Sequence, residues 1–311
     1  MEHHVVIGNG PVGSGVTALL VARGLPVTVV TRSGSGLEHP LVTRLQADAA
    51  DADAVTKAAD GAATIFNCAN PPYHRWATDW PPMHRAIVSA GERTGAVVVM
   101  TDNLYAFGPG TTMPMREHTP MRATAQKGAT RATMATELLA AHAAGTLRAT
   151  LARASDFFGP GVRDSALGER AMPKLLAGKK VGLLGRIDVP HSFSYMPDVV
   201  TTLVTIALDP RAWGAPWHVP NATAVTQGEF VQRMAAAAGT TSTATAIPKA
   251  VIAALGVINP TIRQLKETWY QFAEPWITDS TLTEQTFGLT ATPLDDAAAA
   301  TVAWWRGQVA R

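Results

Sequence analysis

The chain has 311 residues, of which 47% are apolar, and its 26 basic and 24 acidic side chains give a formal net charge of +2. Because the two signs are mixed along the chain, the composition disfavours nucleic acids and membrane surfaces as partners. No apolar stretch reaches the length of a membrane span, so we expect a cytoplasmic protein that acts on a small molecule. The single cysteine, Cys68, excludes a disulfide framework, and we expect no metal site.

The first motif is a glycine-rich turn between an apolar run at residues 4–7 and a helical pattern at 16–22, which leads to a second β-branched run at 27–30. Its glycines have the spacing G-x-G-x-x-G. In this strand-turn-helix context they allow the turn, the approach of a pyrophosphate and close packing of the helix. The sequence therefore predicts a dinucleotide-binding turn. Its residues are Gly8, Asn9, Gly10, Pro11, Val12 and Gly13.

The end of the second strand indicates which dinucleotide binds. An acidic residue at this point would hold a ribose 2′-hydroxyl, but the strand ends in Thr31, Arg32 and Ser33. A guanidinium with neighbouring hydroxyls suits a 2′-phosphate. We therefore expect NADP(H) rather than NAD(H).

Strand and helix patterns alternate through the first half of the chain. We expect further strands at residues 41–45, 63–68, 96–100 and 150–154, and helices at 83–94 and 133–144. Continuous apolar strands that alternate with helices indicate an α/β fold with a doubly wound parallel sheet, a Rossmann fold. We assign residues 1–160 to a dinucleotide-binding Rossmann domain, with a returning portion near residues 190–222.

Residues 161–311 follow another pattern, with long irregular connections between helices. Thr226 and Glu229 have the spacing of a capping box ahead of an Ala-rich helix, and Thr292 with Pro293 has the pattern of a helix start. We expect a smaller, mostly helical domain without a sheet of its own. Its main role would be to bind substrate.

Several segments, in their order and spacing, resemble the short-chain dehydrogenase/reductase superfamily, in its extended or atypical NAD(P)-dependent epimerase/dehydratase-like branch. They are residues 8–13, 67–70, 101–108, 153–161 and the ending at 287–294. The resemblance implies further cofactor contacts after the fourth, fifth and sixth strands. These fall on Ala69, Asn70, Asp102, Lys127, Ala154 and Ser155.

The catalytic residues of that family are not intact in this chain. The family uses a serine after the fifth strand and a Tyr-x-x-x-Lys pair on the next helix; here Asn103 stands at the serine position and no such pair exists. One alignment places Lys127 and Arg131 at the pair, four residues apart on one helical face. A second alignment places Ala129 and Thr133 there and leaves no replacement.

On the first alignment, which we prefer, each side chain has a distinct role. Arg131 would bind ribose hydroxyls, because its permanent charge prevents it from acting as a base. Lys127 would orient a carbonyl or donate a proton, and the Asn103 amide would donate to a developing oxyanion. Tyr105 is the other candidate proton donor.

The segment at residues 71–84 is unusually aromatic for a connection in such a sheet. We expect it to wall a pocket for an apolar or aromatic substrate, although packing in a loop core or a subunit interface would explain it equally well. The candidate substrate-binding residues are Tyr73, Trp76, Tyr105, Asp156 and Phe158.

The function that these residues favour is an NADP(H)-dependent oxidoreductase that moves hydride to or from a carbonyl, imine or alcohol carbon. One alternative is a catalytically silent NADP-binding redox sensor, motivated by the missing serine and tyrosine. Another is a nucleotide-sugar epimerase or dehydratase, for which the aromatic segment offers few polar contacts. The family often dimerises through the helices after the fourth and fifth strands, so the resemblance leaves a homodimer open.

Overall fold

The computed structural model describes residues 3–258 and 260–309. Internal contacts divide it into two units, each made of several chain segments. Unit 1 comprises residues 1–108, 120–153 and 199–219, and unit 2 comprises residues 109–119, 154–198 and 220–311. The expected division into a cofactor domain and a substrate domain concerns what these parts bind, and it stays a prediction.

Unit 1 is built on one seven-stranded sheet with the order β11-β6-β5-β4-β1-β2-β3. The neighbours along β3-β2-β1-β4-β5 are parallel, as are β6 and β11. The sheet is therefore the doubly wound sheet that the sequence predicts, and its first six strands have the Rossmann order. The strands are β1 (His3–Ile7), β2 (Val27–Thr31), β3 (Val42–Gln46), β4 (Ala62–Asn67), β5 (Val97–Asn103), β6 (Ala149–Ala154) and β11 (Pro216–His218).

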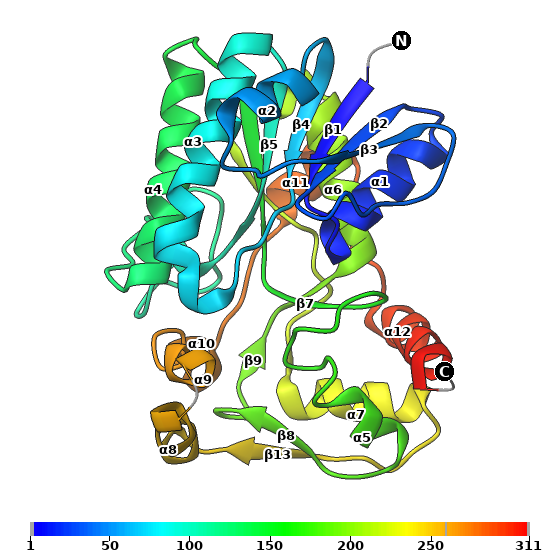
Figure 1. The fold of residues 1–311 in the computed structure, drawn as a ribbon. Coiled ribbons are helices and arrows are strands. Elements are labelled where there is room, and N and C mark those ends of the chain that lie inside the picture. Colours follow the sequence, from blue (N-terminus) through cyan, green and yellow to red (C-terminus); the bar gives the residue numbers. More distant parts are fainter. Residues whose placement is uncertain (1–2, 259, 310–311) are drawn as a thin grey trace. The chain divides into compact units, whose positions relative to one another are not determined.

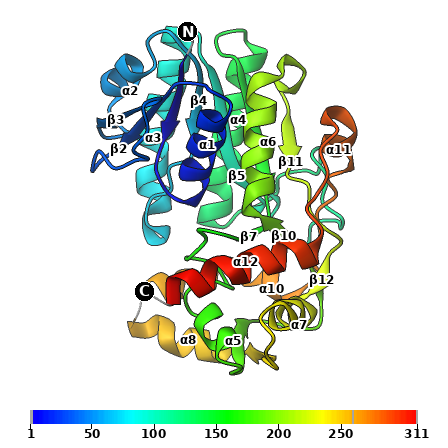
Figure 2. The same cartoon turned by 90° about the vertical axis from the view of Figure 1, so that its right-hand side faces the viewer.

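Helices cover both faces of this sheet, with α2, α3 and α4 on one face and α1 and α6 on the other (Figures 1 and 2). Ile65 of β4, Ile87 of α3 and Leu138 of α4 are at most 1% exposed and meet in one core. The helices are α1 (Pro11–Ala22), α2 (Ala52–Ala58), α3 (Trp76–Thr94), α4 (Gln126–Ala143) and α6 (Met196–Leu208), with the short turns η1 (Tyr73–Arg75), η2 (Tyr105–Phe107) and η3 (Pro210–Ala212).

Three helices begin earlier than the sequence pattern predicts. Helix α1 begins at Pro11, because proline is well suited to the first turn. Helix α3 begins at Trp76 rather than at residue 83 and contains Pro81 and Pro82, which mask its start in the sequence. Helix α4 begins at Gln126 rather than at residue 133. The aromatic segment is thus largely the first part of α3 and not an open loop.

Unit 2 contains three two-stranded sheets, so the expectation of a domain without a sheet of its own was wrong. The pairs are β7 (Asp156–Phe158) with β10 (Phe193–Tyr195), β9 (Pro190–His191) with β12 (Val225–Thr226), and β8 (Val181–Leu184) with β13 (Ala244–Ile247). Strands of two to four residues are too short to show an alternating pattern in a sequence.

The helices of unit 2 surround a separate core that includes Phe158, Phe230 and Trp305. Thr226 and Glu229 form the predicted capping box at the start of α7. Thr292 instead donates from its backbone and hydroxyl to Asp198, and α12 begins two residues later. The helices are α5 (Met172–Leu176), α7 (Gln227–Ala237), α8 (Lys249–Ile258), α9 (Pro260–Gln264), α10 (Tyr270–Ala273), α11 (Thr281–Phe287) and α12 (Leu294–Val309).

Across the described residues, every helix is too short or too polar to cross a lipid bilayer. The same residues contain no group of three or more His, Cys, Asp or Glu side chains arranged to hold a metal ion.

Candidate functional site

The glycine turn joins β1 to α1, and two of its glycines are required by the protein itself. Gly8 has a φ of +98°, a conformation that favours glycine. A Cβ on Gly13 would overlap with the carbonyl oxygen of Gly8, so only glycine lets α1 pack this close to the turn. Both positions therefore have the structural roles that the sequence predicts.

Gly10 differs, because nothing in the protein requires it to be glycine. Its φ is −73°, and an added Cβ would meet no heavy atom within 4 Å. It is exposed at the N-terminus of α1, a 12-residue helix whose first N–H groups face outward. A space that a Cβ would fill, beside free N–H groups, fits a dinucleotide pyrophosphate.

The turn lies at the switch point of the sheet, where β1 and β4 are neighbours although they are not consecutive strands. The backbone of Cys68 donates to the Ile7 carbonyl at 3.0 Å, and a Cβ on Gly8 would lie 2.9 Å from Ala69 Cα. The structure thus brings Ala69 next to the turn. Asn70 follows it and is exposed. Burial raises the pKa of the Cys68 thiol to about 12, so Cys68 is a packing residue here.

The end of β2 presents Arg32 and Ser33 on the surface. Both side chains are exposed, and Ser33 Oγ donates to Ser35 Oγ at 2.9 Å. Arg32 forms no ion pair with any residue that the structure describes. Its guanidinium is therefore available for an anionic group.

Lys127 and three aromatic rings form a cluster at the start of α4. Lys127 is 2% exposed, and its Nζ lies 4.6 Å from the centre of the Tyr73 ring. The Tyr105 ring is 6.5 Å from Tyr73 and is stacked on Trp76 at 5.7 Å. Four of the predicted site residues are thereby brought together. Trp76 is 7% exposed and also packs against Trp80, so the two tyrosines present more surface than Trp76 does.

Asn103 lies at the end of β5, immediately before η2. Its Oδ1 accepts a hydrogen bond from the backbone of Tyr105 at 3.0 Å, which fixes the amide. Its Nδ2 has no partner among residues 3–258 and 260–309. This arrangement leaves an oriented N–H donor of the kind that the serine position requires.

Asp102 is held between two arginines in the interior of unit 1. Arg131 Nε donates to Asp102 Oδ1 at 2.8 Å, and Arg153 Nε donates to Oδ2 at 3.1 Å. The three side chains are at most 3% exposed. Both carboxylate oxygens of Asp102 are thus occupied, so a cofactor contact at this residue would have to involve its backbone.

Arg131 also donates from Nη2 to the carbonyl of Thr101 at 2.5 Å, and its guanidinium lies 5.0 Å from the Trp80 ring. The Arg131 side chain of α4 is therefore fixed against β5 before any ligand binds. Arg153 was not predicted as a partner in this group. The only available signal was a charged residue within the otherwise apolar strand at residues 149–154.

The remaining predicted residues lie in unit 2. Ala154 and Ser155 are buried, the backbone of Ser155 donates to Ser194 Oγ at 2.9 Å, and Ser155 Oγ has no partner in the described structure. Asp156 accepts from His191 Nε2 at 2.7 Å. Phe158 is 3% exposed and packs against Phe230, which leaves little of its ring for a ligand. His191 could not be predicted as the partner of Asp156, because the two residues are 35 apart in the chain.

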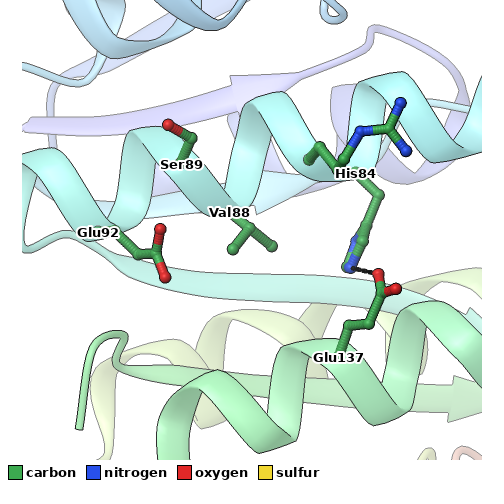
Figure 3. A pocket seen from close by; sticks show the side chains of 6 residues that line it. His84, Val88, Ser89, Glu92 and Glu137 are labelled. Carbon is green, nitrogen blue, oxygen red and sulfur yellow. Dashed lines mark ion pairs between the residues drawn. The ribbon is translucent and has the colours of Figure 1, made fainter. Parts of the chain in front are cut away.

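A small pocket of about 220 Å³ lies on α3 and α4, and its lining contains none of the individually predicted site residues (Figure 3). Figure 3 shows His84 of α3 pointing toward Glu137 of α4, with Nε2 and Oε2 3.5 Å apart. Burial, followed by the charges of Arg131 and Arg85, lowers the pKa of His84 to about 4. Although Glu137 favours the imidazolium, it is 58% exposed and solvent screens it. His84 is therefore neutral at pH 7.

A family model places this chain among known proteins. Residues 5–219 match the model of the NAD dependent epimerase/dehydratase family. The match covers more than half of the chain, and the chain belongs to this family. The resemblance that the motifs of the sequence indicate is thereby confirmed, and with it an NAD-dependent class of enzyme. No curated protein sequence matches the chain.

Solved structures share the fold at low sequence identity. UDP-glucose 4-epimerase from Thermotoga maritima, solved with UDP-glucose, is 17% identical with a TM-score of 0.80, over 99% of both chains. UDP-N-acetylglucosamine 4-epimerase from Methanobrevibacter ruminantium is 16% identical with a TM-score of 0.80, also over 99% of both chains. The Bordetella bronchiseptica enzyme WbmH, solved with NAD+, is 19% identical with a TM-score of 0.75, over 98% of this chain and 99% of that one.

Proposed function

We propose that this chain is an NADP(H)-dependent oxidoreductase that transfers hydride to or from a carbonyl, imine or alcohol carbon of an apolar or aromatic small molecule. The observation that carries the proposal is the buried ammonium of Lys127 among Tyr73, Trp76 and Tyr105, one helical turn from Arg131. Lys127 is 2% exposed, so its amine lies against the aromatic rings rather than in bulk water. On the preferred alignment, Lys127 corresponds to the tyrosine that donates a proton in the family.

When bound, the nicotinamide would supply or accept the hydride. In the reducing direction, the Asn103 amide would donate a hydrogen bond to the substrate oxygen and stabilise its developing negative charge. The Lys127 ammonium would transfer a proton to that oxygen, and the resulting amine would take up a proton from water. Tyr105 is the alternative donor, while Arg131, held on Asp102, would bind ribose hydroxyls.

The test is NADPH oxidation over a panel of aldehydes, ketones and imines, with Lys127→Met beside wild type. Methionine keeps the buried volume but cannot donate a proton, so we expect kcat to fall by about 100-fold or more. Lys57→Met, at an exposed lysine on α2, is the matched control. Full turnover by Lys127→Met would remove Lys127 from the mechanism, and NADPH binding without oxidation of any substrate would contradict the proposed activity.

The preference for NADP(H) rests on Arg32, which is exposed, makes no ion pair within the described chain and follows β2. We expect Arg32→Ala to weaken NADPH binding by about tenfold and to leave NADH binding nearly unchanged, because only NADPH carries the 2′-phosphate. Calorimetric titration with both cofactors measures this. Equal losses for both would contradict a 2′-phosphate contact.

A second candidate function is a nucleotide-sugar epimerase or dehydratase. The family itself and the two 4-epimerase structures support it. The discriminating experiment incubates the protein with UDP-glucose and follows the sugar by NMR. An isomerised product without net change in the cofactor would favour this function over the oxidoreductase. If the protein binds the cofactor but turns over neither class of substrate, this result favours the function of a redox sensor.

A further inference from the structure

Unit 2 contains an aspartate-histidine pair whose geometry is unusually well fixed. His191 Nε2 lies 2.7 Å from Asp156 Oδ2. The His191 ring is parallel to the Phe272 ring at 5.8 Å and lies 4.8 Å from Phe193. Its backbone is held by β12 on one side and by a bridge to Trp276 on the other. The imidazole therefore has little freedom to turn away from the carboxylate.

The two members of the pair differ in exposure. The His191 side chain is 1% exposed, whereas the Asp156 side chain is 24% exposed. The other carboxylate oxygen of Asp156 has no partner within residues 3–258 and 260–309. The histidine is thus the enclosed member and the aspartate the open one, which is the reverse of a pair in which a buried aspartate orients a reactive histidine.

The adjacent residue carries a second polar group without a partner in the described structure. Ser155 is 7% exposed, and its Oγ is a buried hydroxyl without a partner in the described structure. Proteins rarely leave such a group unsatisfied, because its desolvation is not compensated. An open carboxylate oxygen and an unsatisfied hydroxyl thus stand on consecutive residues of one segment.

We propose that Asp156 is a ligand-contacting carboxylate that accepts a hydrogen bond from a hydroxyl or protonated amine of the substrate. His191 is the positioning residue that holds it. This inference rests on the proposed function only in taking the ligand to be that substrate. A carboxylate repels anions at short range, so unit 2 selects against ligands that present a negative group to Asp156.

The test measures binding in the absence of NADPH, by saturation-transfer NMR titration with benzylammonium, benzyl alcohol and benzoate. These probes share a ring and differ in the group offered to Asp156. We expect wild type to bind benzylammonium and benzyl alcohol at least about tenfold more tightly than benzoate. Asp156→Asn should reduce this discrimination to about twofold, whereas Asp164→Asn, at an exposed aspartate of unit 2, should leave it unchanged.

Two variants test the role of His191. His191→Phe keeps the aromatic packing but removes the N–H donor, and we expect it to lose most of the discrimination. His191→Gln restores an N–H donor and should recover the discrimination between the probes. If His191 had a purely structural role, restoring the donor would not be needed for this recovery. Thermal unfolding of each variant identifies any loss of discrimination that is caused by misfolding.

The proposal is overturned if wild type binds none of the probes, if it binds benzoate as tightly as the other two, or if Asp156→Asn keeps the discrimination. Because the titration needs neither cofactor nor turnover, its outcome is separate from that of the proposed activity. A protein that binds benzylammonium through Asp156 but never oxidises NADPH would refute the activity and support this site.

Discussion

At the scale of single residues, the candidate site depends on charged groups that the fold encloses. Asp102 neutralises only one of the two guanidiniums that contact it, so the buried group of Asp102, Arg131 and Arg153 carries a net positive charge. Such a group is stable only while its hydrogen bonds are intact. The position of Arg131, and with it the face of α4 that also carries Lys127, therefore depends on Asp102.

We expect Asp102→Asn to lower the free energy of unfolding by about 3 kcal/mol or more, because two buried guanidiniums lose the negative charge of Asp102. Urea unfolding measures the change. Glu38→Gln breaks the ion pair with Arg44, in which Glu38 is 82% exposed, and should cost less than about 1 kcal/mol. Similar losses in the two variants would show that the buried group is not a determinant of stability.

His84 makes stability depend on pH. Its pKa in the folded protein is about 4, below its ordinary value of 6.5, so the unfolded chain binds more protons between these values. The stabilisation is complete above pH 6.5 and is lost as the pH falls toward 4. From this residue alone we expect the protein to be about 2 kcal/mol less stable at pH 5 than at pH 8.

Urea unfolding at a series of pH values tests this prediction. His84→Leu should flatten the dependence between pH 6.5 and 4, whereas His39→Gln, at an exposed histidine, should leave it as it is. An unchanged slope in His84→Leu would show that His84 is not buried in its neutral form.

At the scale of elements, the close approach of α4 to η2 positions Lys127 beside Tyr105. Gly128 makes this approach possible, since a Cβ there would overlap with Ala123 and with the carbonyl oxygen of Tyr105. Helix interiors otherwise disfavour glycine. The glycine next to Lys127 is therefore explained by packing.

We expect Gly128→Ala to destabilise the protein by about 1–3 kcal/mol and to lower turnover, because α4 must move away from η2. Gly307→Ala is the matched control in α12, where an added Cβ meets nothing within 4 Å and should stabilise by about 0.5–1 kcal/mol. Chemical unfolding of both variants gives the comparison. A stabilising Gly128→Ala would contradict the packing role.

The sequence predicted elements that have a strong periodic pattern and missed those that depend on distant contacts. The glycine turn and the parallel sheet followed from glycine spacing and continuous apolar strands. The start of α3 was missed because Pro81 and Pro82 are atypical inside a helix. Two side-chain pairs were missed because their members are distant in the chain. Asp156 and His191 are 35 residues apart, and Asp102 and Arg153 are 51 residues apart, so no local pattern indicates these contacts.

At the scale of the whole molecule, the candidate site residues are divided between the two units. Unit 1 contains the glycine turn, Lys127 and Asn103, whereas unit 2 contains Asp156 and His191. The cofactor contacts proposed for the glycine turn and the ligand contact proposed for Asp156 can therefore be impaired separately. Variants in the glycine turn should abolish cofactor binding but keep the preference of Asp156 for hydrogen-bond donors.

We propose that the first turn of this chain binds a nicotinamide dinucleotide, and calorimetric titration of NADPH into wild type and Gly10→Val tests this binding most directly. Valine fills the space beside Gly10 without meeting protein atoms near its Cβ, so the folded protein should remain stable. We predict saturable binding to wild type, at least about tenfold weaker binding to Gly10→Val, and an unchanged Tm. Absence of NADPH binding to wild type, or equal affinity of the two proteins for NADPH, would contradict dinucleotide binding at this turn.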